Sequence, residues 1–206
     1  MGTKYVDQTI KIYNAIAEEY AKQAERHAPD KQRRTFLSLL PKKATIVDMG
    51  CGSGRETKFF CEHGCSVIGI DLSEKLLAIA KKEAPQATFI KKDIRSITLP
   101  NEHVDGIWMC ASLLHIKREE APAVVKRMYA MLRPGGIFFL HLKEGVGDEE
   151  RIDPSAPGIT RHFTLYTKKE VEQLVSNAGF VIVRCFKPKK RKSTHVQWIS
   201  CFAKKV

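Results

Sequence analysis

The segment Ile46-Val47-Asp48-Met49-Gly50-Cys51-Gly52-Ser53-Gly54-Arg55 decides the fold of this chain. Its β-branched and apolar residues predict a buried strand, its closely spaced glycines predict a sharp turn, and residues 56–60 predict a helix. Glycines in such a turn let a ligand approach the main chain, because no Cβ stands in the way. The free N–H groups that open the helix then face the same space. The segment therefore predicts a ligand site at the end of the strand.

Glycine spacing separates two classes of ligand that use such a turn. A dinucleotide site has the pattern G-x-G-x-x-G, whereas here Gly54 follows Gly50 by four positions and the acid Asp48 precedes the turn. Asp48-x-Gly50-x-Gly52-x-Gly54 resembles the first motif of class I S-adenosylmethionine-dependent methyltransferases, in which the turn packs under the methionine part of the cofactor. The resemblance implies S-adenosylmethionine as cofactor, S-adenosylhomocysteine as product, and cofactor contacts from Asp48, Gly50, Cys51, Gly52, Ser53, Gly54 and Arg55.

Two acids further along the chain fit the remaining parts of a nucleoside. Asp71 ends the second predicted strand, about twenty residues after the turn, where a carboxylate accepts hydrogen bonds from both ribose hydroxyls. A dinucleotide would use Asp71 in the same way, so this residue does not separate the two classes. Asp93 falls where the resemblance implies an acid that binds the adenine amino group; a surface turn is the alternative. Leu72 and Ile94 follow these acids and are expected to contact the cofactor.

The segment 104–116 resembles the family's fourth motif, in which an aspartate precedes an apolar strand that ends beside the sulfonium. The resemblance implies that Cys110 and Ala111 lie next to the methyl group. Relatives that methylate exocyclic amines of nucleobases usually carry Asn/Asp-Pro-Pro-aromatic at this strand end, and cytosine-C5 enzymes use Pro-Cys. This chain has Cys110-Ala111-Ser112-Leu113 instead, which argues against methylation of nucleobases.

The chain is expected to form one α/β domain over residues 1–206, with a Rossmann-like three-layer sandwich. Seven strands are predicted, and the short connection 187–195 makes the last two an antiparallel hairpin. The resemblance implies a mostly parallel sheet in the order 3-2-1-4-5-7-6, with strand 7 antiparallel. Residues 1–40 are expected to form an N-terminal helical cap. The stretch from 144 to 160 is expected to be a loop, and 144–166 a lid or substrate loop.

One N-terminal helix is predicted from apolar residues that recur every three or four positions, namely Val6, Ile10, Tyr13, Ala17, Tyr20 and Ala24. Such a helix either only covers the sheet or also holds Tyr13 and Tyr20 over the ligand. The pattern Tyr13-Asn14-x-x-Ala17-x-x-Tyr20 is similar to the N-terminal segment of many small-molecule methyltransferases, where the helix helps to close the cofactor pocket.

Candidate acceptor groups follow strands four and five and the lid, because open α/β sheets bind ligands at the carboxyl ends of their strands. They are His115, Lys143, Glu144, Arg161 and Tyr166. His115 suits a general base, or it begins a helix and bonds to the backbone. Arg161 suits a carboxylate or phosphate, or a structural salt bridge. Methyl transfer from a sulfonium depends mainly on alignment, so no catalytic triad and no metal are expected.

Composition narrows the remaining choices. No apolar run reaches the roughly 20 residues of a membrane span, and the first residues lack the apolar core of a signal peptide, so a cytoplasmic protein is expected. Six cysteines form no CxxC pair, which favours reduced thiols over a zinc site.

Three functions remain open on the sequence. The first is methyl transfer to a small-molecule acceptor. The second is the same chemistry on RNA or protein, docked through Lys187–Lys192, because residues 187–206 carry seven Lys or Arg and no acid within a net charge of +12. The third is a non-catalytic module that binds S-adenosylmethionine.

Overall fold

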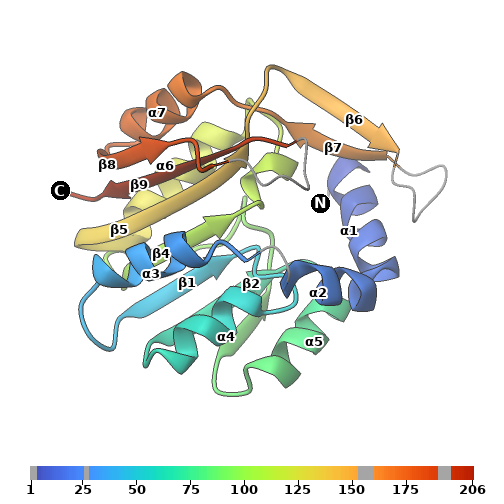
Figure 1. Cartoon of the computed structure of the whole chain (residues 1–206), viewed down its shortest axis with the longest axis horizontal. Coiled ribbons are helices and arrows are strands. Elements are labelled where there is room, and N and C mark those ends of the chain that lie inside the picture. The colour runs from blue at the N-terminus through green and yellow to red at the C-terminus, as the bar shows by residue number, and fades with distance from the viewer. Residues whose placement is uncertain (1–3, 26–27, 153–159, 190–195) are drawn as a thin grey trace.

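A computed structural model of the chain describes residues 4–25, 28–152, 160–189 and 196–206. Its main sheet has seven strands in the order β3-β2-β1-β4-β5-β9-β8, with β9 antiparallel to both neighbours and the first five parallel (Figure 1). The strands are β1 Thr45–Met49, β2 Ser66–Asp71, β3 Thr88–Lys91, β4 Val104–Cys110, β5 Leu132–Lys143, β8 Val181–Phe186 and β9 Trp198–Lys204. The predicted order is confirmed, the sixth and seventh predicted strands being β8 and β9.

Helices cover both faces of this sheet and complete three layers (Figure 1). They are α1 Lys4–Ala15, α2 Ala17–Glu25, α3 Asp30–Ser38, α4 Arg55–Glu62, α5 Glu74–Glu83, α6 Ala121–Met131 and α7 Lys168–Asn177, with a 3₁₀ turn, η1, at Leu113–His115. Local sequence sets two of the starts: the Ser73 hydroxyl accepts from the Leu76 N–H, and Thr167 with Glu170 forms a capping box.

Alternating residues of the strands divide the core into two clusters, as the two-residue period of a strand requires. One cluster, under α3 and α4, is aromatic; the rings of Trp108 and Phe139 stack there at 4.0 Å between centroids. The other contains Met109 and Phe138, which alternate with those rings and pack with residues of α6 and α7. The central strands β4 and β5 are thus buried on both faces.

The prediction of a single N-terminal helix from the apolar spacing is wrong. The chain is interrupted at Ile16, although the Ile16 N–H still bonds to the Ile12 carbonyl and the Tyr20 N–H to the Ile16 carbonyl. The break lets α1 contact the strand at 160–164 while α2 lies against α5. The apolar stripe continues through the break, so the spacing could not reveal it. Strand five also begins earlier than predicted, at Leu132, and includes the glycine turn that was expected to precede it.

The loop predicted from 144 to 160 contains a strand, β6 Asp148–Ile152, which pairs with β7 Thr160–Thr164 in an antiparallel hairpin. Residues 153–159 of the predicted lid lie outside the described residues. Charged residues dominate β6, so no alternation of apolar and polar residues marks it as a strand. In Figure 1 the hairpin and α1 lie at the same end of the molecule, toward which the arrows of β1 and β4 point.

Three expectations from composition concern the whole chain. All six cysteines are free thiols. Among the helices that the structure describes, none combines the length and the apolar character needed to cross a membrane. Of the basic stretch at 187–192, Lys190, Arg191 and Lys192 lie outside the described residues.

Candidate functional site

A cavity lies at the carboxyl ends of the parallel strands, with α1 along one side. It contains about 690 Å³ of space without protein atoms, part of it open to solvent. The predicted residues that line it are Tyr13, Tyr20, Gly50, Gly52, Asp71, Leu72, Asp93, Ile94, Cys110, Ala111 and His115. The structure therefore brings residues from the glycine turn, from three strand ends and from the N-terminal helix to one place.

Gly50 joins the turn after β1 to the segment after β4. Its φ is 74°, and a Cβ built on it would lie 2.4 Å from the Ser112 Cβ. The Ser112 hydroxyl donates to the Met49 carbonyl at 2.7 Å, which holds the two segments together. Next to Ser112, Ala111 has a φ of 58°, which is a left-handed conformation. This conformation is energetically unfavourable for any residue with a side chain, and it often marks a functional site.

The Asp71 carboxylate lies over the glycine turn. One oxygen accepts from the Gly52 N–H at 2.9 Å, and the other accepts from the Ser73 N–H at 2.8 Å. Burial raises the pKa of Asp71, while these backbone donors lower it. Each carboxylate oxygen has a second lone pair. The residue can therefore hold the turn in shape and still accept hydrogen bonds from a pair of ligand hydroxyls.

Five predicted cofactor residues support the turn and do not line the cavity: Asp48, Cys51, Ser53, Gly54 and Arg55. Asp48 is buried and accepts from the Thr57 hydroxyl of α4 at 2.7 Å. Burial and the neighbouring Glu56 raise the pKa of the Asp48 carboxyl. Arg55 pairs with Glu56 at 2.6 Å and donates to the Ala24 carbonyl at the end of α2. These contacts connect the turn to α4 and α2.

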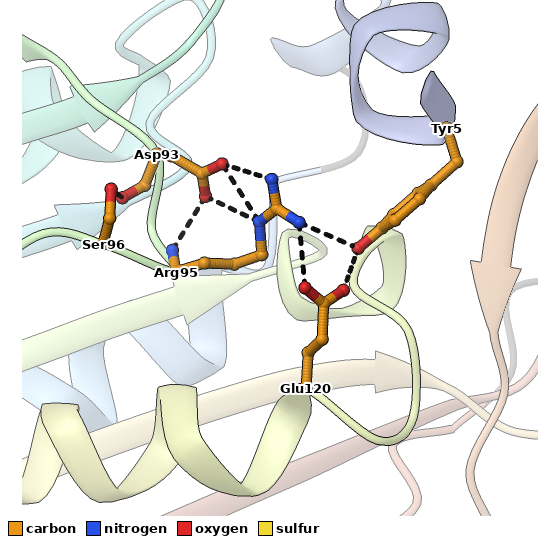
Figure 2. Close-up of polar contacts among 5 residues, drawn as sticks. All are labelled: Tyr5, Asp93, Arg95, Ser96 and Glu120. Atoms are coloured by element: carbon orange, nitrogen blue, oxygen red, sulfur yellow. Dashed lines mark hydrogen bonds and ion pairs between the residues drawn. The ribbon is translucent and has the colours of Figure 1, made fainter. Parts of the chain in front are cut away.

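Asp93 belongs to a network that reaches the N-terminal helix, and Figure 2 shows its members. The Arg95 guanidinium donates to both oxygens of Asp93 at 2.7–3.1 Å and to Glu120 at 2.9 Å. The Tyr5 hydroxyl of α1 donates to the other oxygen of Glu120. Asp93 is thus held at the edge of the cavity by a group that also contacts α1 and the start of α6. Tyr5, the Asp93–Arg95 pair and Glu120 are far apart in sequence, so no local pattern predicts this network.

His115 has one defined tautomer in this site. Its Nδ1 lies 3.1 Å from the His162 carbonyl, which can only accept, so Nδ1 carries the hydrogen. Nε2 then holds a lone pair and accepts from the Tyr13 hydroxyl at 2.9 Å. Burial, with the charges of Arg161 and Lys143, lowers the pKa of His115 to about 3. With this lowered pKa, the imidazole is a neutral hydrogen-bond acceptor at neutral pH.

The other predicted acceptor residues do not line the cavity. Lys143 and Arg161 contact the ring of Phe163, with Lys143 Nζ at 3.9 Å and Arg161 Cζ at 5.4 Å from its centroid. Tyr166 is buried under the guanidinium of Arg118 and does not line the cavity. Glu144 pairs with Lys187. Lys143 and Arg161 are thus near the site, whereas Tyr166 is not part of it.

Several lining residues were not predicted as site residues: Val6, Thr9, Ile10, Leu76, Lys92, Ser112 and Ile116. Val6 and Ile10 belong to the apolar stripe that predicted the N-terminal helix, so this stripe could have indicated them as lining residues. Asn14 is a further missed contact; its side-chain oxygen accepts from the Ser73 hydroxyl at 2.7 Å and from the Lys75 N–H at 3.2 Å. It attaches the end of α1 to the start of α5.

Comparison with known proteins gives three findings. Residues 46–136 match the family model described as a methyltransferase domain. The chain is 32% identical over 111 residues to the malonyl-(acyl-carrier protein) O-methyltransferase of Enterobacter lignolyticus (strain SCF1), a match covering 52% of this chain and 43% of that protein. It is 33% identical over 107 residues to the trans-aconitate 2-methyltransferase of Variovorax paradoxus (strain S110), covering 51% of this chain and 40% of that protein.

A solved structure extends the likeness to the whole fold. The crystal structure of Burkholderia thailandensis 1,6-didemethyltoxoflavin-N1-methyltransferase, with bound 1,6-didemethyltoxoflavin and S-adenosylhomocysteine, superposes with a TM-score of 0.81. The match covers 100% of this chain and 92% of that chain, at 19% sequence identity. The matches to the two curated relatives span less than half of their lengths.

Proposed function

The chain belongs to the class I S-adenosylmethionine-dependent methyltransferases through the domain at residues 46–136, and we propose that it transfers a methyl group from S-adenosylmethionine to a small-molecule acceptor. The observation that carries this proposal is the Asp71 carboxylate, which lies over the glycine turn and borders the cavity. Asp71 would bind the ribose hydroxyls. Asp93 and Ile94 would bind the adenine, and Gly50 and Gly52 would lie under the methionine part.

The fit to this cofactor is supported by the shape of the turn. A Cβ at Gly52 would lie 3.5 Å from the Tyr20 ring, so the bare glycine leaves room between the turn and α2. Cys110 and Ala111 end β4 in the same cavity and would lie beside the reacting methyl group. When bound, S-adenosylmethionine supplies a methyl group on a positively charged sulfur, which leaves as the neutral thioether S-adenosylhomocysteine when an acceptor lone pair takes the methyl.

The residues of this chain contribute alignment and exclusion of water. Helix α1 covers the cavity with Val6, Thr9 and Ile10, which leaves less of it open to solvent. Neutral His115 holds the Tyr13 hydroxyl through its Nε2 lone pair, and the oxygen of that hydroxyl can accept a hydrogen bond that orients an acceptor. A group with a pKa of about 3 is a weak base at neutral pH, so we assign His115 a positioning role in place of the general-base role expected from sequence.

A small-molecule acceptor is favoured by two of the three named proteins. Their names specify a malonyl group on acyl-carrier protein, trans-aconitate and 1,6-didemethyltoxoflavin as acceptors of those proteins. The alternative of RNA or protein as acceptor depended on the basic stretch at 187–192. Lys187 pairs with Glu144. Lys190, Arg191 and Lys192 of the same stretch lie outside the described residues. A non-catalytic module would bind the cofactor without turnover.

Calorimetric titration with S-adenosylhomocysteine, and separately with NAD, tests the cofactor assignment. We expect the wild type to bind S-adenosylhomocysteine and not NAD. Asp71→Asn should weaken binding by about ten- to a hundredfold, since a hydrogen bond to a charged group contributes about 1.5–3 kcal/mol. Glu62→Gln, on the exposed end of α4, is the matched control and should bind like the wild type. Binding of NAD alone would overturn the assignment.

Turnover separates the three functions. S-adenosylhomocysteine formation should appear with small acceptors and should change little with salt. An RNA substrate would instead give product whose formation falls steeply as salt rises. Tight cofactor binding with no product from small acceptors, RNA or protein would favour the non-catalytic module.

A further inference from the structure

Three cations surround one aromatic ring beside the cavity. Lys143 Nζ lies 3.9 Å from the centroid of the Phe163 ring, Arg161 Cζ lies 5.4 Å from it, and Arg151 Cζ lies 5.7 Å from it. We call Lys143, Arg151 and Arg161 the cation cluster. Lys143 ends β5, whereas the two arginines face each other across the β6–β7 hairpin. Three elements thus bring positive charge to one point.

Within the described part of the chain, no carboxylate pairs directly with the half-buried ammonium group of Lys143. Among the residues that the structure describes, none accepts a hydrogen bond from its ammonium group or forms an ion pair with it. Burial, and then Arg151 and Arg161, lower the pKa of Lys143 to about 8, and Glu149 opposes this shift. Keeping an unpaired ammonium partly out of water costs free energy. An anion placed here would recover it.

The acids of the described hairpin already have other partners. Glu149 pairs with Arg151 at 2.6 Å. Asp148 lies 3.8 Å from both Arg118 and His162, and Glu150 lies 3.8 Å from the other ring nitrogen of His162. At the start of the lid, Glu144 pairs with Lys187. Glu149 thus pairs with Arg151 of the cluster itself, and no described carboxylate pairs directly with Lys143, which leaves the lysine available to a ligand anion.

The cluster also lies at the end of the cavity where the acceptor would be. The Phe163 ring is 5.0 Å from the His115 ring, and Arg161 Cζ is 5.3 Å from the Tyr13 ring. Tyr13 and His115 both line the cavity. In addition, the Ala111 N–H donates to the His141 carbonyl, which fixes the end of β4 two residues before Lys143 on β5. An anion held by the cluster would therefore lie beside Tyr13 and His115, at the wall of the cavity.

We propose that the cation cluster binds an anionic group of the methyl acceptor, a carboxylate or a phosphate, so that the acceptor is an acidic small molecule. Lys143 supplies a point charge, and an arginine supplies the planar fork that matches the two oxygens of such a group. This inference rests on the proposed function, since it concerns the acceptor of the same methyl transfer. It goes beyond that function by naming the chemical class of the acceptor.

Chemical labelling of lysine tests the proposal without turnover. The wild type is treated with acetic anhydride at pH 8, with S-adenosylhomocysteine present, and acetylation of each lysine is followed by mass spectrometry. Malonate and glutarate represent carboxylates, glycerol 3-phosphate represents phosphates, and malonamide is the uncharged control. We expect one class of anion to slow labelling of Lys143 several-fold and malonamide to have no effect. Lys117 is the internal control, because its ammonium lies 5.3 Å from the Tyr5 ring, outside the cluster.

Two variants complete the test. Lys143→Met should raise KM for acidic acceptors about tenfold, with little change in kcat and unchanged affinity for S-adenosylhomocysteine, whereas Lys117→Met should not. Equal labelling of Lys143 with and without anions, or an equal KM for acidic acceptors in wild type and Lys143→Met, would overturn the acidic acceptor while leaving methyl transfer in place. Failure of the wild type to bind S-adenosylhomocysteine would instead overturn the proposed function.

Discussion

At the scale of single residues, position 50 has two requirements that only glycine meets. Its φ of 74° is strained for any residue with a Cβ, and its Cα faces Ser112 so closely that an added Cβ would lie 2.4 Å from the serine Cβ. The need for glycine in this turn could be predicted from the spacing of the motif. The neighbour that enforces it could not, because Ser112 is brought there by the pairing of β1 with β4.

Gly50→Ala should destabilise the protein more than Gly64→Ala. Gly64 has a φ of 81°, but a Cβ added to it would have nothing within 4 Å, so its substitution measures the backbone cost alone, about 1–2 kcal/mol. Gly50→Ala adds a clash with Ser112, and we expect a larger loss of unfolding free energy together with weaker binding of S-adenosylhomocysteine. Urea unfolding of both variants checks this. Equal losses would show that Ser112 moves aside at no cost.

Two histidines with lowered pKa values should make stability depend on pH. Burial lowers the pKa of His115 to about 3 and that of His141, which contacts Ser200, to about 4. The unfolded chain takes up protons near pH 6.5, before the folded protein does. The stabilisation that comes from keeping these histidines neutral is therefore fully present above about pH 6.5. It is lost as the pH falls toward the lowered pKa values, by at most about 1.4 kcal/mol of unfolding free energy per pH unit for each histidine.

Urea unfolding between pH 4.5 and 8 measures this effect. His141→Gln should flatten the decline of unfolding free energy at low pH, since the titrating group is gone. His103→Gln, at an exposed position, is the control and should keep the wild-type slope. If both variants decline alike, the buried histidine is not the source of the dependence.

At the scale of elements, α1 is attached to the site at three points. Tyr5 donates to Glu120, Tyr13 donates to His115, and Asn14 accepts from Ser73. The helix is therefore a wall of the cavity that is held from both ends. The sequence predicted a helix here with Tyr13 and Tyr20 near the ligand, and the structure places both in the cavity wall.

Tyr5→Phe should loosen the start of α1. The change removes the hydrogen bond to Glu120 and keeps the ring, so we expect faster amide hydrogen exchange in α1 and S-adenosylhomocysteine affinity lowered several-fold. Tyr129→Phe is the control, because its hydroxyl contacts the carbonyl of Val206, which is outside the site. Unchanged exchange in α1 would mean that its packing, rather than this network, holds it.

The elements that sequence missed share a physical cause. Strands buried on both faces, such as β4 and β5, are continuous apolar runs and were predicted. Strand β6 carries Asp148, Glu149 and Glu150 in succession, and it forms because β7 offers it backbone partners. The Tyr5–Glu120–Arg95–Asp93 network likewise depends on long-range packing. The sheet and the motif positions could therefore be predicted from sequence, whereas the hairpin and the contacts that close the site could not.

At the scale of the whole molecule, ligand binding should raise stability, because the site is formed by distant parts of the chain that must be folded together. At S-adenosylhomocysteine concentrations of 100 times Kd, the gain is about 2.7 kcal/mol. For a domain of this size that corresponds to a rise in Tm of roughly 5–10 °C. Differential scanning calorimetry checks this, with NAD as the control ligand. A rise with NAD and none with S-adenosylhomocysteine would contradict the cofactor assignment.

Helix α1 borders the space for both reactants, since Val6 and Ile10 line the cavity and Tyr13 contacts His115 on the acceptor side. Because both reactants would contact α1, an acceptor bound against Tyr13 would obstruct a cofactor that enters beside this helix. We therefore expect an ordered sequence of arrivals, with S-adenosylmethionine first and S-adenosylhomocysteine released last. In product-inhibition kinetics, S-adenosylhomocysteine should compete with S-adenosylmethionine and should not compete with the acceptor. Competition with both would show that the two reactants enter independently.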